Sequence, residues 1–211
     1  YLFCHGINLF LRPLFRSPDE NVIQSVQWIG KPPYPVFFSY DPSNRGDKPY
    51  MGEVNDFMFC LLTGAGNMTI DNVKTGNTTA WIVLNTNSNR DENRKAVMEY
   101  VRKYYNNLRS FWDDNEVSDF SFVLQPFKWS GQSIGGMAFD NGFVAKYSSE
   151  GGLILNEGRE FTLSHEIGHR WIGGDGINAG INNLWLTEGF NDYVTYYTLL
   201  SSKMMTPEQF A

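Results

Sequence analysis

The chain has 211 residues, with 23 acidic against 17 basic side chains and a formal net charge of −6. Hydrophobic residues make up 42% of it and aromatic residues 16%, which excludes a disordered segment. The acidic balance gives no basic footprint for nucleic acid or an anionic membrane, and no apolar run approaches the roughly 18 residues of a membrane span. The presence of only two cysteines excludes a disulfide-rich scaffold and a cysteine-based metal site.

Residues 1–86 are expected to form a β-rich, sandwich-like N-terminal domain. Short segments rich in aromatic and β-branched side chains alternate there with turn signals such as residues 74–77. Cys4 and Cys60 both fall in this part, and the sequence leaves open whether they pair or remain thiols. The expected strands are residues 1–3, 7–11, 22–28, 36–40, 57–62, 68–70 and 80–84.

Near residue 87 the short strand-like segments give way to a helical pattern, and an α+β domain is expected over residues 87–211. Hydrophobic side chains recur at helical spacing across residues 91–112, which predicts an amphipathic helix. A glycine-rich stretch follows at residues 131–142. The other expected elements are strands at 120–125, 143–147 and 153–155 and helices at 157–172 and 185–202. Strands followed by helices favour the α+β class.

The end of the sequence and its composition favour a fragment of a longer, exported protein. Thr206, Pro207 and Glu208 form a helix start, with a cap, a first-turn proline and a first-turn acid. A helix that begins and is then cut implies more chain, so a further C-terminal domain is expected. The acidic charge, the few basic residues and the many Asn, Gly and aromatic residues favour export but leave the compartment open.

The strongest chemical signal is the segment His-Glu-Ile-Gly-His, which holds two of the three histidines, His165 and His169. On a helix, residues four apart lie on one face, about 6 Å apart along the axis, so the two imidazoles can converge on one cation. Zinc suits two imidazoles plus a carboxylate, with a fourth position open to water. Bound zinc would lower the pKa of that water, and Glu166 would take its proton.

A third ligand is expected at Glu188, which follows His169 after eighteen intervening residues. Glu188 lies in an apolar, aromatic segment that is predicted to be helical, where a lone carboxylate would be costly unless paired or metal-bound. Asp192, on the same helical face, could accept the outer N–H of a metal-bound imidazole and fix its tautomer; Asn191 is the alternative. The expected centre is one zinc ion per chain, with the ligands His165, His169 and Glu188.

These motifs resemble those of the gluzincin metallopeptidases, in which HExxH, eighteen further residues and a glutamate hold zinc. The closest resemblance is to the aminopeptidase N and leukotriene hydrolase family, because residues 169–173 are similar to its H-x-W-x-G and residues 184–190 to its L-W-L-x-E-G-F. The glycyl aminopeptidase family is a second candidate, because residues 9–13, and residues 196–197 followed by 205–208, are similar to segments of that family. The resemblance implies a thermolysin-like catalytic domain that follows a β-sandwich-type domain.

The resemblance also implies a substrate-binding segment in the glycine-rich stretch. In the family this segment reads G-x-M-E-N; its backbone forms an edge strand that pairs with the peptide, and its glutamate holds the free amino terminus of the substrate. Ala138 occupies the position of that glutamate here, while Asp140 could supply a carboxylate if the segment bulges. A plain glycine loop is the alternative. The residues implied in substrate binding are Gly135, Gly136, Met137, Ala138 and Asp140.

The function predicted from these motifs is a zinc metallopeptidase, aminopeptidase-like, that cleaves a peptide substrate with metal-activated water and Glu166 as the base. The alternatives are a zinc endopeptidase and a peptide-binding or scaffold module that retains zinc without catalysis. The absence of the family's glutamate favours the module, whereas the intact Glu166 favours an enzyme. The family's transition-state tyrosine lies past the end of this sequence, so the resemblance implies a fragment that is itself inactive or a poor catalyst.

Overall fold

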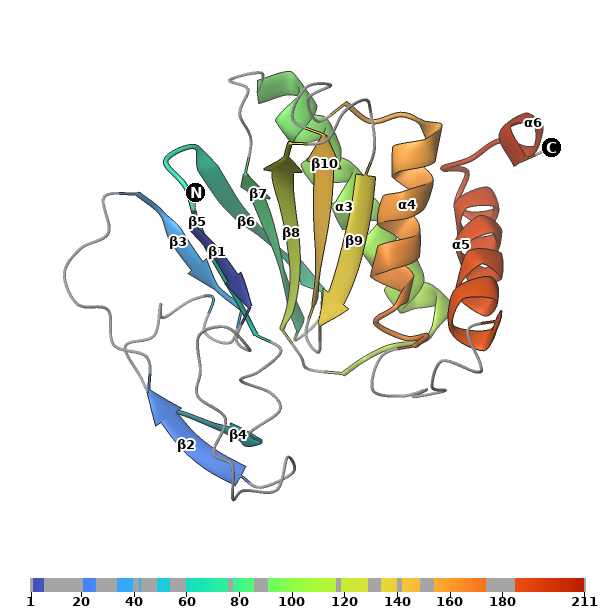
Figure 1. The fold of residues 1–211 in the computed structure, drawn as a ribbon. Coiled ribbons are helices and arrows are strands. Elements are labelled where there is room, and N and C mark those ends of the chain that lie inside the picture. The colour runs from blue at the N-terminus through green and yellow to red at the C-terminus, as the bar shows by residue number, and fades with distance from the viewer. Residues whose placement is uncertain are drawn as a thin grey trace.

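The computed structural model describes residues 2–5, 21–25, 34–39, 42, 49–53, 60–75, 78–85, 91–116, 119–128, 134–139, 142–148, 154–173 and 185–210. Within these residues the strands form a five-stranded, a three-stranded and a two-stranded sheet, and helices pack beside the largest sheet (Figure 1). None of the described helices is both long and apolar enough to cross a membrane.

The five-stranded sheet is the platform of the fold. Its strands, in spatial order, are β6 (Met68–Thr75), β7 (Thr78–Asn85), β8 (Phe120–Phe127), β10 (Gly142–Ser148) and β9 (Ile134–Phe139). The outer pairs β6–β7 and β9–β10 are antiparallel, whereas β7–β8 and β8–β10 are parallel. Among the described strands, the glycine-rich stretch therefore contributes β9 at the edge of this sheet.

The helix predicted over residues 91–112 is confirmed as α3 (Asp91–Phe111). It connects the parallel strands β7 and β8, so the three elements form a βαβ unit that the sequence analysis did not predict. The described residues thus form a mixed α/β fold. The α3 side chains that face the sheet are fully buried; they are Val97, Val101, Tyr104 and Leu108.

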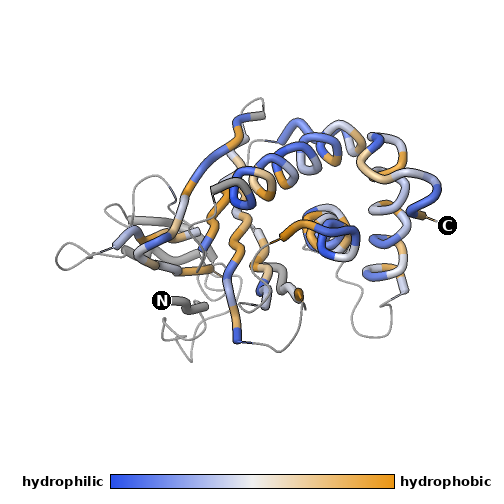
Figure 2. The backbone as a smooth tube through the Cα atoms, turned by 90° about the horizontal axis from the view of Figure 1, so that it is seen from above, coloured by the Kyte–Doolittle hydropathy of each residue, from blue (hydrophilic) through white to orange (hydrophobic). Residues whose placement is uncertain are grey.

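Both faces of the five-stranded sheet are covered, because alternate side chains of each strand point to opposite faces. Ile82, Phe122 and Phe143 pack in the core beneath the helices. Val83 and Val123, one residue further along, pack instead against the three-stranded sheet. Figure 2 shows the hydrophobic residues concentrated along the central strands, whereas hydrophilic and hydrophobic stretches alternate along the helices.

The small sheets come from the expected β-rich part of the chain. The strand expected at residues 7–11 lies outside the described residues, and β4 was not predicted. Cys60 is buried beside the three-stranded sheet, and the side chain of Cys4 lies outside the description. The strands are β1 (Leu2–His5), β5 (Leu61–Gly64) and β3 (Val36–Phe38) in one antiparallel sheet, and β2 (Asn21–Ser25) with β4 (Pro49–Glu53) in the other.

The predicted domain boundary between residues 86 and 87 does not follow the sheet. β6 and β7 precede that boundary, yet β7 pairs with β8, which follows it, from Ala80 opposite Phe120 to Leu84 opposite Leu124. The two strands therefore share a sheet with the later half of the chain. A β hairpin has the same sequence pattern whether or not one of its strands also pairs with a distant strand. The sequence pattern therefore could not show that β7 pairs with β8. The division into two domains remains a prediction.

Two strand predictions differ from the structure. β8 continues past Pro126, because β7 pairs with β8 only as far as Leu124 and the missing proline N–H can fall on the unpaired side. Of the strand expected at residues 153–155, residue 153 lies outside the described residues, and residues 154 and 155 form no strand. The chain instead leads there into a helix start, where the Asn156 side chain accepts a hydrogen bond from the Arg159 backbone N–H.

The helices near the C-terminus are shorter or less regular than expected. The helix predicted over residues 157–172 ends earlier, as α4 (Glu157–Gly168), and turns lead from there to Gly173, whose φ of +85° suits glycine. The helix predicted over residues 185–202 begins with a π-helical turn, η2 (Trp185–Gly189), and continues as α5 (Phe190–Ser201). The helix start predicted at residues 206–208 is confirmed as α6 (Pro207–Phe210).

Candidate metal centre

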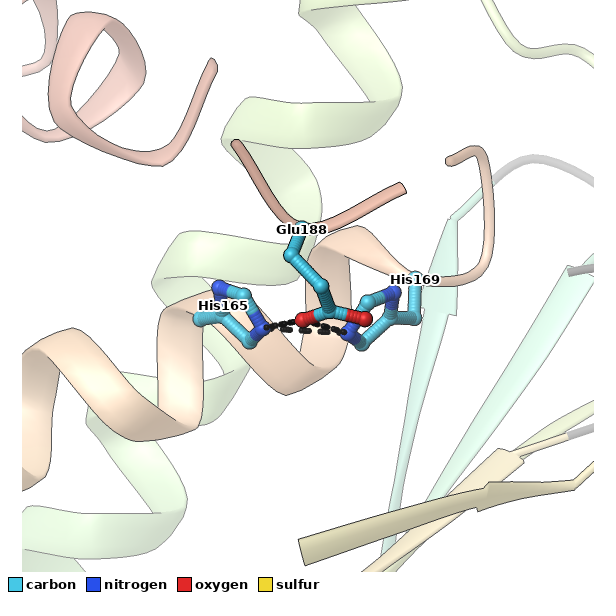
Figure 3. Close-up of side chains that lie close together, drawn as sticks. All are labelled: His165, His169 and Glu188. Atoms are coloured by element: carbon cyan, nitrogen blue, oxygen red, sulfur yellow. Dashed lines mark hydrogen bonds and ion pairs between the residues drawn. The ribbon is translucent and has the colours of Figure 1, made fainter. Parts of the chain in front are cut away.

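Three side chains converge at the C-terminal end of α4. His165 and His169 lie on one face of the last turn, and their Nε2 atoms are 3.0 Å apart. Glu188 reaches them from η2, with its Oε2 atom 3.2 Å from Nε2 of His165 and 3.7 Å from Nε2 of His169. Figure 3 shows the two imidazoles and the carboxylate pointing toward one another.

The donor set and its spacing fit a zinc ion. Zinc binds imidazole nitrogen at about 2.0–2.1 Å in tetrahedral geometry, which places two donor atoms roughly 3.3 Å apart. The three separations of 3.0, 3.2 and 3.7 Å bracket that value. Only small movements of the side chains are therefore needed to bind a metal. The ligand atoms of the three side chains all lie within 4.8 Å of one another, which is close enough to share a metal ion. Among the described residues, no other group of three or more His, Cys, Asp or Glu side chains meets this condition.

Both imidazoles are also held at their outer nitrogens. Nδ1 of His165 lies 2.7 Å from Oδ1 of Asp192, and Nδ1 of His169 lies 2.9 Å from the carbonyl oxygen of Ile172. A carboxylate and a carbonyl can only accept, so each Nδ1 carries the hydrogen and each Nε2 keeps its lone pair for a metal. Asp192 lies where the sequence analysis expected it, whereas the Ile172 carbonyl was not predicted.

Asn191, the weaker candidate for this outer contact, does not touch the imidazole ring. Its Nδ2 atom instead donates to the backbone carbonyl of His165 at 2.8 Å. Glu188 and Asp192, four residues apart across the junction of η2 and α5, both face His165. Asp192, Asn191 and Glu188 therefore contact the same histidine at three different atoms.

The carboxyl group of Glu166 lies against the edge strand β9. A Cβ atom added to Gly136 would lie 2.4 Å from the Glu166 carboxyl carbon and 2.6 and 2.7 Å from its oxygens. Burial raises the pKa of Glu166; the nearby His169 opposes this shift and Glu188 adds to it. The expected base is thus close to the metal ligands, and a side chain at residue 136 could not share its space.

The remaining residues implied in substrate binding also belong to β9 or follow it. Met137 and Ala138 pair through their backbones with Val144 and Phe143 of β10, while their side chains lie outside the description. Asp140 lies outside the described residues. Among the described strands, β9 pairs on one side only, with β10. Its other side is the sheet edge that passes Glu166.

Asp114 is a polar anchor that the sequence analysis missed. Its Oδ2 atom accepts a hydrogen bond from Trp171 Nε1 at 3.0 Å and lies 3.5 Å from Arg109 and 3.7 Å from Arg170. The anchor joins the end of α3 to the turn that follows His169. No sequence signal could have revealed it, since Asp114 and Trp171 are 57 residues apart. A cavity of about 490 Å³ lies beside this anchor, but no residue of the metal centre lines it.

Comparisons with known proteins point to one kind of fold. No profile of a known protein family matches the chain. A stretch of 51 residues is 41% identical to aminopeptidase N of Mus musculus, which is 24% of this chain and 5% of that protein. The structure is similar to an aminopeptidase N family protein from Idiomarina loihiensis, with a TM-score of 0.70 and 15% identity over 96% of this chain and 38% of that one. The chain therefore has the fold of part of such a protein, and spans well under half its length.

Replacing Asp192 should weaken the metal centre. Asp192→Ala removes the acceptor that orients the His165 ring, so the affinity of the chain for zinc is expected to fall about 10- to 100-fold. Competition with a chromophoric chelator measures this affinity. Glu99→Ala is the matched control, because Glu99 is an exposed carboxylate on α3. Equal zinc affinity in Asp192→Ala and in the unmodified chain would contradict the assigned role.

Replacing Gly136 should displace the base without removing the metal. In Gly136→Ala the new methyl group overlaps the Glu166 carboxyl group, which must move. If the protein that carries this chain hydrolyses peptides with Glu166 as the base, the rate should fall at least about 10-fold, because misplacement of a reacting group by about 1 Å can cost 100-fold. Zinc content should stay unchanged. Gly66→Ala is the control, since a Cβ there meets nothing within 4 Å.

Proposed function

We propose that the chain is the metal-binding part of a zinc-dependent metallopeptidase of the gluzincin type, with a thermolysin-like catalytic domain. The convergence of His165, His169 and Glu188 within metal-binding distance, beside the half-buried Glu166, carries this proposal. The local identity to mouse aminopeptidase N and the likeness of the fold to an aminopeptidase N family protein support it.

The proposed roles follow from the positions of the side chains. His165, His169 and Glu188 would hold one zinc ion, which when bound polarises a substrate carbonyl and acidifies a water molecule. Glu166 takes a proton at its carboxylate and passes it to the leaving amine. The burial that raises the pKa of Glu166 makes its carboxylate the stronger proton acceptor. Asp192 holds the His165 ring so that Nε2 stays directed at the metal.

The proposed substrate is a peptide that lies along β9. An extended peptide can add to a free sheet edge through backbone hydrogen bonds, and β9 is the edge strand of the described sheet. Glu166 lies against Gly136 in that strand, so a bond of the bound peptide would pass close to the base. The proposal includes a further C-terminal domain in the whole protein, which supplies the transition-state tyrosine that the gluzincin resemblance implies. It includes no nucleic-acid partner.

Two alternatives share the same centre. A zinc endopeptidase is favoured by Ala138, because the G-x-M-E-N segment of the resembling family has at that position the glutamate that holds a free amino terminus. A peptide-binding module without catalysis would keep the zinc ligands but would have no use for a carboxylate beside them at residue 166. We prefer an enzyme to the module, because Glu166 is present and lies between the ligands and β9. The preference for an aminopeptidase-like enzyme over an endopeptidase rests on the local identity to aminopeptidase N and on the likeness of the fold.

Glu166→Gln in the whole protein tests the proposed chemistry. An amide cannot accept the proton, so the rate of peptide hydrolysis is expected to fall about 100- to 10,000-fold. Zinc content should remain one ion per chain, because Glu166 is not a ligand. Glu157→Gln, an exposed position at the start of the same helix, is the control. If Glu166→Gln hydrolyses peptides as fast as the unmodified protein, Glu166 is not the base. If neither protein hydrolyses any peptide while both bind zinc, the binding module is the correct function.

A panel of peptides separates exopeptidase from endopeptidase activity. We expect the whole protein to cleave peptides with a free amino terminus faster than the same peptides with an acetylated one, by at least about 10-fold, which corresponds to roughly 1.4 kcal/mol of transition-state binding. Mass spectrometry of the products locates the cleaved bond. Equal rates on free and blocked peptides would contradict the aminopeptidase preference and favour the endopeptidase.

A further inference from the structure

Asn191 makes an unusual contact with the helix that carries the histidine ligands. Its side chain is fully buried, and its Nδ2 atom donates to the carbonyl oxygen of His165 at 2.8 Å. α4 ends at Gly168, so this carbonyl belongs to the last turn, where backbone oxygens lack a regular partner in their own helix. Asn191 thus caps a partly buried carbonyl of α4 from the neighbouring helix α5, and carbonyls shielded from water need such partners.

The space that Asn191 occupies exists because residue 168 is glycine. A Cβ atom added to Gly168 would lie 2.1 Å from Oδ1 and 3.1 Å from Cγ of Asn191. No alanine or larger residue can share this space with the asparagine as placed. Gly168 and Asn191 therefore form a matched pair, in which the missing side chain on α4 admits the amide from α5.

This pair lies between the groups that hold the metal. From the same segment, Glu188 reaches Nε2 of His165 at 3.2 Å and Asp192 reaches Nδ1 at 2.7 Å. These two contacts hold the imidazole ring, whereas Asn191 holds the backbone of the same residue. A shift of α5 by one residue would move its side chains about 1.5 Å along the axis and turn them by about 100°. Both ring contacts would then be lost.

We propose that Asn191 is a positioning residue for the metal centre: seated over Gly168, it locks α5 against α4 in the register that brings Glu188 and Asp192 to His165. The inference rests on the proposed function in one respect, namely that the ion so positioned is zinc. The lock itself is a property of the two helices.

Zinc affinity of three variants tests the lock. Asn191→Ala removes the cap, and Gly168→Ala introduces a methyl group where the amide lies. Each is expected to weaken zinc binding at least about 10-fold, as is typical for residues that orient metal ligands. In the double variant, the methyl group at residue 168 no longer meets an amide. The zinc affinity of the double variant should therefore equal that of Asn191→Ala alone. Gly158→Ala is the control for a glycine change in α4, because a Cβ there meets only an oxygen of Asn156 at 3.8 Å.

A second readout keeps the test independent of folding failures and of the proposed function. Thermal unfolding is measured in excess chelator, so that no metal is bound. The unfolding temperature of the double variant should then equal that of Asn191→Ala, so the effects of the two changes on stability should not add. Asn191→Leu, similar in size but without the N–H donor, should fold and bind zinc at least about 10-fold more weakly even if Gly168→Ala does not fold. Additive effects in the double variant, or full zinc affinity in both Asn191→Ala and Asn191→Leu, would overturn the lock. If the unmodified chain binds no zinc, the proposed function fails, and the unfolding data alone decide the lock.

Discussion

The contact between α4 and α5 is the constraint on which the candidate metal centre depends. Two histidines four residues apart on a helix supply two donors by local geometry, but the third donor comes from a different element. Bringing Glu188 to within 3.2 Å of His165 requires the two elements to approach closely. Glycine at residue 168 permits that approach, and the buried amide of Asn191 makes it specific.

The five-stranded sheet supports this centre from the other side. α3 packs on the sheet through fully buried side chains, and α4 packs in the same core through Leu163 and Ile167. α4 also lies so close to β9 that a Cβ atom added to Gly136 would lie 2.4 Å from the carboxyl carbon of Glu166. The expected base therefore lies between the helix that carries the two histidines and β9, which is the edge strand among the described strands. With the Glu166 carboxyl group in this position, any side chain on residue 136 would overlap it.

Much of the local structure could be predicted, because helical periodicity and turn residues act over a few positions. The helix at residues 91–112 and the helix start at residues 206–208 are examples. The hairpin of β6 and β7 was assigned to the earlier part of the chain, because its pairing with β8 joins residues about forty positions apart. The first turn of the last long helix is π-helical, and no periodic pattern in the sequence distinguished it from a regular turn.

The sequence by itself determined the identity of the expected ligands and base. HExxH places two imidazoles on one helical face whatever surrounds it, and the following glutamate and aspartate share a face for the same reason. Only the tertiary structure decided how these groups are held. The partners of Asn191, Asp114 and Glu166 lie on other elements, and each contact depends on how closely two backbones approach. Spacing along one helix follows from its backbone geometry, whereas the distance between two elements follows from the packing of the whole core.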